Sequence, residues 1–395
     1  MARLGDVFEI QITGEWGSEC TENETGTKVL RTTNFTPEGR INYDDVVVRS
    51  INESKVEKKR LHCGDIILEK SGGTEKTPVG RVVFCDESIE ESIYLCNNFT
   101  QAMRVNQTIA IPRYVFYFMW NLHCSGRTDL LQNKTTGIRN LQVKSYLNEE
   151  CPLPTLDEQR KIAAVLDKVR DLIAKRRQQL DKLDEAVKAR FVEIFGEPDE
   201  NPKHWQEDEL SQHLKVIGGY AFKSDGFTDG GIPVLRIGNI NSGHFLPVNM
   251  VYWSDDLALA RYKVFPGDLV MSLTGTVGKD DYGNVCILGS DYDEYYLNQR
   301  NAKLSIEKSL NKCYFSELLK FPRIKKRLTG ISRGIRQANI SNKDILTLRV
   351  PIPPIELQEQ FAAFVEQTGK TKIIISHSFE KLETLKKALM QEYFG

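Results

Sequence analysis

Two clusters of basic side chains are the first groups in this sequence that could act on a ligand. The segment from Arg323 to Arg336 contains no acidic residue, and its basic residues are Arg323, Lys325, Lys326, Arg327, Arg333 and Arg336. The other cluster lies in the first half of the chain and consists of Arg127, Lys134, Arg139 and Lys144. Such clusters suit contacts with phosphate groups, which position a protein on a nucleic acid without reading its sequence.

A further set of arginine and amide side chains has the donors and acceptors that read base edges. Arginine pairs with guanine, and asparagine or glutamine pairs with adenine. The first half offers Arg31, Asn34, Gln101 and Arg104, with the loop residues Lys70, Ser71 and Lys76. The second half offers Arg236, Asn239, Gln299, Arg300 and Asn301, with the loop residues Thr274, Thr276 and Lys279. Each could instead be an ordinary surface residue, and Asn34 and Asn239 are equally suited to forming turns.

Motifs for catalysis are missing from the sequence. The pair Gly278-Lys279 lacks the earlier glycine and the following Ser or Thr of a phosphate-binding loop. An acidic group around Asp44 and Asp45 resembles a nuclease carboxylate set, but it has no counterpart in the second half of the chain. The 8 cysteines form no CxxC pair, so a zinc site is not indicated. We therefore expect no catalytic residue, metal or cofactor in this chain.

Five segments of the first half recur, in the same order, in the second half. The pairs are VLRTTNF (29–35) with VLRIGNI (234–240), CGDIILEKSGG (63–73) with PGDLVMSLTGT (266–276), GIR (137–139) with GIR (334–336), PLPTLDEQRKIAAVLD (152–167) with PIPPIELQEQFAAFVE (351–366), and KLDEAVKARFVEIFG (182–196) with KLETLKKALMQEYFG (381–395). The last two pairs have the same offset, 199 residues, from Pro152 to Pro351 and from Lys182 to Lys381. Ordered repetition of this kind indicates a duplicated structural unit.

Each copy consists of a region of mixed pattern, a proline-rich hinge and a long helix. Proline cannot lie inside a helix but is common just before one. We predict a mixed α/β fold with an internal pseudo-two-fold repeat and four segments: a domain over 1–150, a hinge and helix over 151–196, a second domain over 197–350, and a second hinge and helix over 351–395.

The first long helix is expected from Asp157 to Phe195, roughly 58 Å at 1.5 Å per residue. Its apolar residues recur with the 3-4 spacing of a coiled coil, interrupted by Arg176. The second helix has a more polar stripe that includes Thr368, Lys372 and Lys386. We expect the two helices to pair as an antiparallel coiled coil that separates the two domains. The alternative is that each helix packs only on its own domain.

Short apolar runs bounded by glycine, proline and asparagine predict the strands within the domains. The expected strands are Asp45–Val48, Asp65–Leu68, Val82–Cys85, Thr108–Ile111, Asp268–Ser272 and Asn284–Leu288. Helices are expected over Arg113–Cys124 and Asn311–Leu319.

The overall charge is nearly balanced, with 53 basic and 54 acidic residues. Proteins that bind nucleic acid unaided are usually more basic, so a partner would have to supply part of the positive field. The most apolar run, Tyr114–Trp120, is far shorter than the roughly 20 residues that cross a bilayer. We expect a cytoplasmic protein with no membrane partner.

The duplicated Gly-Asp pairs Gly64-Asp65 and Gly267-Asp268, the segment Gln337–Ser341 and the hinge PIPPIELQEQF resemble the specificity subunit of Type I restriction–modification systems. The resemblance spans the whole chain. It implies two target recognition domains, each reading one half of a split site in double-stranded DNA, and a helical spacer that sets the gap. Because the two copies have diverged, we expect the two halves of the site to differ.

The resemblance also implies partners and the absence of cofactors. Two methyltransferase (modification) subunits would bind this chain, joined in some complexes by ATP-dependent restriction or motor subunits. In that family S-adenosylmethionine binds the methyltransferase partner, so none is expected here. Two alternatives stay open: a restriction or modification enzyme with an unrecognised active site, and a coiled-coil adaptor that never contacts bases.

Overall fold

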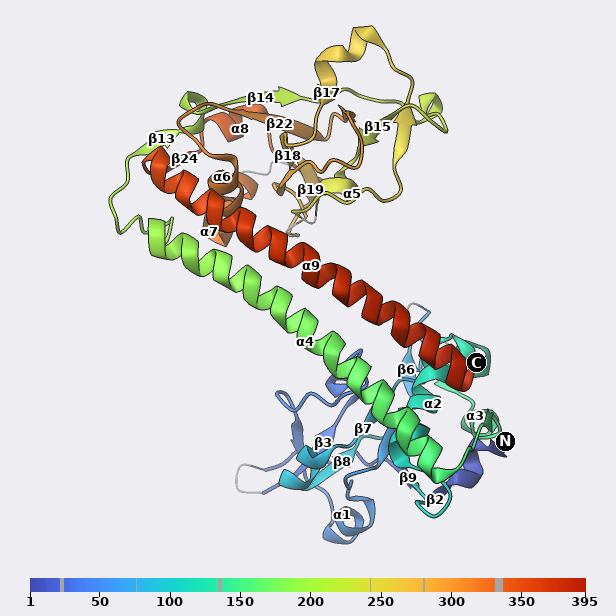
Figure 1. The fold of residues 1–395 in the computed structure, drawn as a ribbon. Helices are drawn as coiled ribbons and strands as arrows, with labels where there is room; N and C mark the ends of the chain where they lie inside the picture. The colour runs from blue at the N-terminus through green and yellow to red at the C-terminus, as the bar shows by residue number, and fades with distance from the viewer. Residues whose placement is uncertain (22–24, 76, 134–136, 242, 280, 331–336) are drawn as a thin grey trace. The chain divides into compact units, whose positions relative to one another are not determined.

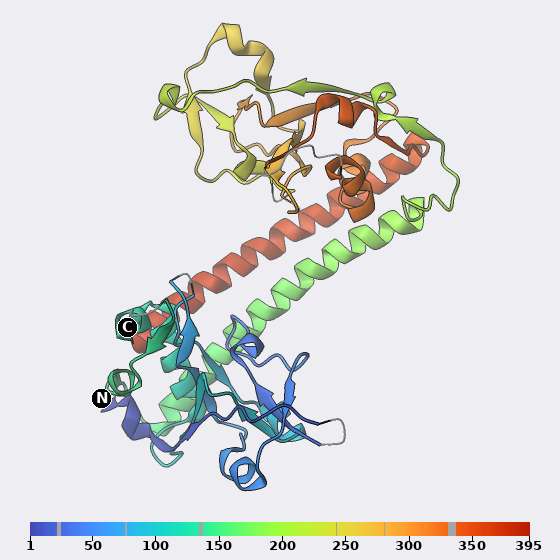
Figure 2. The ribbon, with the colours of Figure 1, turned by 180° about the vertical axis from the view of Figure 1, so that it is seen from behind.

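The computed structural model describes residues 1–21, 25–75, 77–133, 137–241, 243–279, 281–330 and 337–395. The chain divides into two compact units (Figures 1 and 2). Unit 1 comprises Met1–Arg177 and His377–Gly395, and unit 2 comprises Gln178–Ser376. Both have the predicted mixed α/β character.

Unit 1 is built around two sheets. The strands of the first, in spatial order, are β2 (Phe8–Thr13), β9 (Thr100–Val105), β5 (Ile66–Glu69) and β7 (Val82–Phe84), all antiparallel. The second contains β4 (Val47–Arg49), β3 (Thr27–Leu30) and β8 (Tyr94–Cys96), with β3 parallel to β8. Ile66 and Leu68 face one apolar core, and Ile67 faces another. Burial on both faces explains the unbroken apolar run of β5.

Unit 2 repeats this arrangement. Its first sheet orders β14 (Leu214–Gly218), β22 (Asn301–Ile306), β18 (Leu269–Ser272) and β20 (Val285–Ile287). Its second sheet orders β16 (Val251–Trp253), β15 (Ile232–Leu235), β21 (Tyr295–Leu297) and β17 (Lys263–Val264), with β15 parallel to β21. Leu269 and Met271 face one core and Val270 faces another, as in unit 1. The duplication inferred from the sequence is therefore confirmed in the four strands of the first sheet and in three strands of the second, to which unit 2 adds β17.

Smaller elements complete each unit, and several of them recur in matching places. Unit 1 has β1 (Ala2–Arg3) paired with β12 (Glu150–Cys151), β6 (Ser71–Gly73) with β11 (Arg139–Leu141) and β10 (Gln132–Asn133), and the helices α1 (Glu53–Lys59), α2 (Pro112–Cys124) and α3 (Val143–Leu147). Unit 2 has β13 (Glu207–Glu209) paired with β24 (Arg349–Pro351), β19 (Thr274–Thr276) with β23 (Gln337–Asn339), and the helices α5 (Ile237–Ile240), α6 (Lys312–Leu318), α7 (Pro322–Thr329) and α8 (Asn342–Leu346).

The predicted short helices and most predicted strands are confirmed within two residues at each end. One strand, Thr108–Ile111, is wrong. The side chain of Asn106 accepts hydrogen bonds from the backbone N–H and hydroxyl of Thr108, 3.0 and 2.7 Å, which forms a turn instead. Pro112 then begins α2, where its missing N–H costs nothing.

The long helices are α4 (Leu156–Phe195) and α9 (Ile355–Phe394), 40 residues each. Within unit 1, Nε of Arg176 on α4 donates to Oγ of Ser378 on α9 over 3.2 Å. Leu166 lies before Arg176 on α4, Met390 lies after Ser378 on α9, and these two residues belong to one apolar core. The two segments therefore run antiparallel, and Arg176 has a polar partner on the other helix.

Unit 2 contains the complementary halves of both helices, and they also run antiparallel. The rings of Phe191 on α4 and Phe361 on α9 lie 5.4 Å apart. Farther along, Lys372 of α9 forms an ion pair with Asp184 of α4. In each unit the helices thus contact one another as well as their domain, which confirms the predicted antiparallel pairing over the alternative of separate packing.

A buried glutamine joins each long helix to its hinge. In unit 1, Gln159 accepts from the backbone N–H of Ile111 (2.8 Å) and donates to the carbonyl of Pro154 (2.9 Å). In unit 2, Gln358 accepts from the backbone N–H of Asn311 (2.8 Å) and donates to the carbonyl of Pro353 (2.7 Å). Both side chains are fully buried. The repeated segment contained this glutamine, but its role was not predicted.

We expect Gln358→Leu to destabilise unit 2 by about 2–4 kcal/mol, because a backbone donor and a carbonyl would lose their buried partner. The measurement is the midpoint of urea unfolding followed by circular dichroism. Gln367→Leu, an exposed position on the same helix, is the control and should change stability by less than about 0.5 kcal/mol. Equal midpoints for the two variants would contradict this role of Gln358.

Candidate DNA interface

The turn after each parallel strand β3 or β15 is held by a buried asparagine. Asn34 accepts from the N–H of Arg31 (2.8 Å) and donates to the carbonyls of Asn42 (3.0 Å) and Asp45 (2.9 Å). Asn239 accepts from the N–H of Arg236 over 2.9 Å. Both amides are almost fully buried, so their groups are used within the turn. The turn-forming alternative therefore holds, and we drop Asn34 and Asn239 as candidate base-reading residues.

This turn places one arginine at the same point of each unit, but the arginines have different partners. The guanidinium of Arg31 donates to the carboxylate of Asp45 over 2.8 Å and to its carbonyl over 3.2 Å. The guanidinium of Arg236 donates to the backbone carbonyl of Asn249. The positive charge of Arg31 is thus paired with a carboxylate, whereas among the described residues the side-chain partner of Arg236 is a carbonyl.

A second turn, before β9 or β22, is also repeated. In unit 1 the N–H of Thr100 donates to the carbonyl of Asn97 (3.0 Å), and in unit 2 the N–H of Asn301 donates to the carbonyl of Asn298 (2.9 Å). Phe99 and Arg300 each lie two residues after these asparagines. Their carbonyls accept from the N–H groups of Lys70 and Leu273, over 2.9 and 2.8 Å respectively. These bonds show that Phe99 and Arg300 occupy equivalent positions.

The two turns of unit 2 border one cleft of about 580 Å³. Its walls are formed by Phe222, Ser224, Phe227, Arg236, Ile237, Gly238, Asn239, Val248, Asn249, Asn298, Gln299 and Arg300. The structure thus brings together four predicted residues from two distant segments: Arg236, Asn239, Gln299 and Arg300. Arg236, Gln299 and Arg300 are exposed at the cleft, and no acidic side chain is among the described residues that line it.

The repeated Gly-Asp pair has a structural role. The buried carboxylate of Asp65 accepts two hydrogen bonds from Arg104, each 2.8 Å, and one from the N–H of His62, also 2.8 Å. In unit 2, Asp268 makes the matching ion pair with Lys303 over 2.7 Å. The hydrogen bond from Arg104 to Asp65 raises the pKa of the guanidinium. Arg104 is therefore a partner of Asp65, and we drop it as a candidate base-reading residue.

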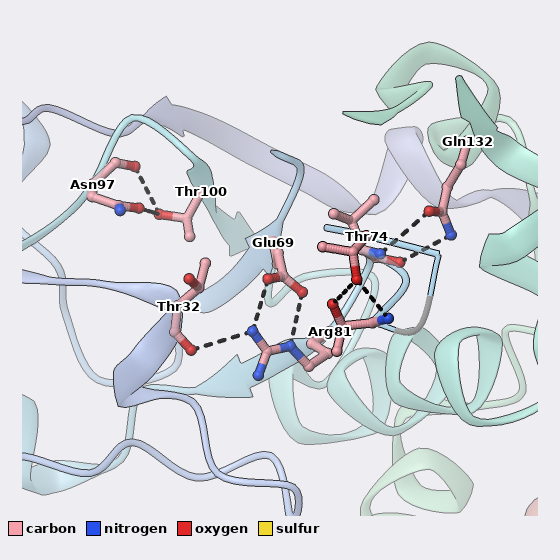
Figure 3. Close-up of polar contacts among 9 residues, drawn as sticks. Thr32, Glu69, Thr74, Arg81, Asn97, Thr100 and Gln132 are labelled. Carbon is pink, nitrogen blue, oxygen red and sulfur yellow. Dashed lines mark hydrogen bonds and ion pairs between the residues drawn. The ribbon is translucent and has the colours of Figure 1, made fainter. Parts of the chain in front are cut away.

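Arg81 connects the first sheet of unit 1 to the Arg31 turn, and the sequence did not predict it (Figure 3). It donates to the buried carboxylate of Glu69 over 2.7 and 2.8 Å and to the carbonyl of Thr32 over 3.3 Å. The hydrogen bonds to Glu69 raise the pKa of the Arg81 guanidinium. Figure 3 also shows the hydroxyl of Thr100 beside Asn97, to whose carbonyl it donates a hydrogen bond of 2.8 Å.

The equivalent position in unit 2 is occupied by Asn284. Its amide donates to the carbonyl of Asn241, at the end of the Arg236 turn, over 2.8 Å. It also accepts from Nζ of Lys325 over 2.7 Å, and Lys325 is almost fully buried. Lys325 thus supports the turn from behind, which corrects its prediction as a phosphate-contacting residue.

Several other predicted residues have partners inside their own unit. Asn301 is fully buried and donates to the carbonyl of Leu235 over 2.8 Å. Gln101 donates to Gln11 over 3.1 Å, and Arg127 pairs with Glu149 at 3.0 Å. Buried Asn301 cannot reach a ligand, so we drop it, whereas the ion pair of Arg127 lies partly in solvent and could exchange for a phosphate.

The remaining predicted residues lie on or near the surface of their units. Lys70, Thr274 and Arg139 are partly exposed; Lys279, Thr276, Lys326 and Arg323 are exposed; and the hydroxyl of Ser71 donates to Asn140. Arg323 and its neighbour Arg327 face Asp199, at 3.8 and 3.1 Å. Lys76, Lys134, Arg333 and Arg336 lie outside the described residues. No comparison tests any of these sites, and they stay predictions.

Within the described ranges, no three His, Cys, Asp or Glu side chains gather as metal ligands would. In the same ranges, no helix is both long and apolar enough to cross a membrane.

Known proteins with similar sequences share one family. Residues 1–184 and 202–387 each match the model for the Type I restriction modification DNA specificity domain. The chain is 27% identical over 278 residues to the Type I restriction enzyme MjaVIII specificity subunit of Methanocaldococcus jannaschii, covering 66% of this chain and 64% of that relative. It is 23% identical over 361 residues to the putative MjaX specificity subunit of the same organism, covering 87% and 80%.

Solved structures agree on the fold. The Type I restriction–modification S subunit of M. genitalium aligns with a TM-score of 0.60 at 14% identity, covering 100% of this chain and 95% of that one. Both family matches coincide with the two copies found in the sequence, and together they cover most of the chain. The chain therefore belongs to the family of Type I restriction–modification DNA specificity proteins.

Proposed function

We propose that this chain is the DNA specificity subunit of a Type I restriction–modification complex, with one unit reading each half of an asymmetric bipartite site. The observation that supports this proposal best is the pair of turns repeated in both units. Their framework hydrogen bonds are the same, but the side chains at their tips differ. One scaffold that presents two different sets of side chains suits two different short sequences.

We further propose that the chain does no chemistry itself. The polar side chains described at the cleft of unit 2 are arginines, amides and the hydroxyl of Ser224. Arginines and amides can hold DNA, and no histidine or carboxylate stands among these side chains as a general base for the serine. Methyl transfer and S-adenosylmethionine would belong to two methyltransferase subunits, and ATP to motor subunits where these are present. The net charge of −1 fits a chain that grips DNA together with such partners, inside the cytoplasm.

An exposed apolar pair marks a docking surface for these partners. Ile373 and Ile374 on α9 are each 71% exposed, whereas most large apolar side chains of unit 2 are buried. Burying such a side chain in an interface contributes about 1.5–3 kcal/mol. We propose that this part of α9 contacts a methyltransferase subunit.

The function predicts a two-part recognition site. When the complex is reconstituted with its methyltransferase subunits, sequencing of the methylated DNA should show two short, different sequences at a constant separation. Labelled S-adenosylmethionine and DNA should give no methyl transfer with this chain alone. Methylation by the isolated chain would favour the alternative of an unrecognised active site. A complex that methylates without sequence preference would favour the adaptor.

Modularity can be tested separately. Replacing residues 1–150 with the corresponding domain of a related specificity subunit should change one half of the methylated site and leave the other half unchanged, because the framework of each unit is complete in itself. The measurement is again sequencing of methylated positions. A change in both halves, or in neither, would contradict the assignment of one half to each unit.

The docking surface predicts a loss of assembly without a loss of folding. The double variant Ile373→Ser, Ile374→Ser should weaken binding of the methyltransferase subunits by at least about tenfold, measured by calorimetry. Lys370→Ser, on an exposed position of the same helix, is the matched control and should bind normally. Unchanged binding of the double variant, with normal circular dichroism, would exclude this surface.

A further inference from the structure

The two units differ in charge at equivalent points of the repeated turns. In unit 1 these points hold Arg31, which is paired with Asp45, and the apolar Phe99. In unit 2 they hold Arg236 and Arg300, which border one cleft. The local formal charge is therefore zero in unit 1 and +2 in unit 2, although the backbones are held by the same hydrogen bonds.

The guanidinium N–H groups at these points have different partners in the two units. The guanidinium of Arg31 donates to the carboxylate of Asp45, and freeing it for another ligand would break that ion pair. In the described part of unit 2, neither Arg236 nor Arg300 has a carboxylate within ion-pair distance. Arg236 is instead oriented by the carbonyl of Asn249, a residue with a positive φ of 52°. A carbonyl partner fixes the direction of the side chain and leaves its charge unneutralised.

The two guanidinium groups of the cleft discriminate among the four bases. Each guanidinium offers only donors, so it matches an edge that offers only acceptors. In the major groove guanine presents two adjacent acceptors, N7 and O6. Adenine presents an acceptor beside a donor, and the donor would face a guanidinium N–H. Cytosine presents a donor at the corresponding edge, and the described walls of the cleft contain no carboxylate to accept it. Thymine presents a single acceptor, O4, beside its methyl group.

We propose that the cleft of unit 2 reads guanine in its half of the DNA site through Arg236 and Arg300, and that Arg31 does not read guanine in the other half. This inference rests on the proposed function, because it assigns bases to the unit that reads one half-site. The two half-sites then differ for two reasons. Asp45 neutralises the arginine of unit 1, and Arg300 of unit 2 stands where unit 1 has Phe99. Contact of the same arginines with phosphate is the alternative outcome of the test.

The test uses the reconstituted complex and the site that it methylates. The half read by unit 2 is the one left unchanged when residues 1–150 are exchanged. Each guanine of that half is then replaced by 7-deazaguanine, which keeps Watson–Crick pairing but removes the N7 acceptor. We expect wild-type binding to weaken roughly tenfold or more at one guanine. The variants Arg236→Ala and Arg300→Ala are each tested in the same way. At the guanine that its arginine reads, the affinities of each variant complex for the normal and the substituted DNA should agree within about threefold.

Arg31→Ala is the matched control, because it removes the equivalent arginine of unit 1. It should keep the full discrimination between guanine and 7-deazaguanine. If Arg236→Ala and Arg300→Ala instead weaken both DNAs equally and lower the salt dependence by about one ion each, the arginines contact phosphate and the proposal is overturned. A unit 2 half-site without guanine would overturn it as well.

Failure of this inference can be distinguished from failure of the proposed function. If wild-type complex methylates a bipartite site but neither arginine affects guanine discrimination, only the base assignment is lost. If wild-type complex shows no bipartite site, the proposed function itself is lost. Circular dichroism of each variant, compared with wild type, establishes that the chain still folds.

Discussion

The candidate interface depends on two buried asparagine amides. Asn34 and Asn239 each hold a turn through three hydrogen bonds, from one arginine N–H and to two carbonyls. A buried amide that lost these partners would cost several kcal/mol, so the turn has one conformation. The neighbouring arginine is thereby held at a fixed point, and only its side-chain partner differs between the units. The position of the arginine thus depends on a neighbouring asparagine whose amide groups bond within the turn.

The sequence predicted the features that depend on periodicity and repetition. The duplication, the two long helices and their antiparallel pairing follow from order, spacing and proline positions, which are local properties. It did not predict the roles of Gln159, Gln358 and Arg81, because each has a partner that tertiary folding brings close. These partners are the backbone N–H groups of Ile111 and Asn311 and the carboxylate of Glu69. The same limit explains Arg104: guanidinium groups that bind a ligand and those that bind a buried carboxylate look identical in a sequence.

The polar residues on the helix seam illustrate a related trade-off. A fully apolar seam would bury more area, but it would also tolerate helices shifted by one turn. Arg176 bonds to Ser378 in unit 1 and Lys372 pairs with Asp184 in unit 2, and a shift of one helical turn would break both contacts. One polar contact of this kind specifies register at some loss of stability. For a proposed spacer between two reading domains, a fixed register matters more than maximal stability, because a slip of one turn moves a domain by about 5.4 Å.

Each unit combines bonded residues that hold its turns with exposed residues at the ends of these turns. This division explains how such a chain can change its target without losing its fold. The ion pairs Asp65–Arg104 and Asp268–Lys303 and the buried amides recur in both units, whereas Phe99 and Arg300 do not. Residues of the first kind are buried or partly buried and bonded to their own unit, so substituting them costs stability. Residues of the second kind are exposed, where substitution is usually worth less than about 0.5 kcal/mol. Divergence after duplication would therefore be free to alter charge at the tips, and it is there that the two units differ.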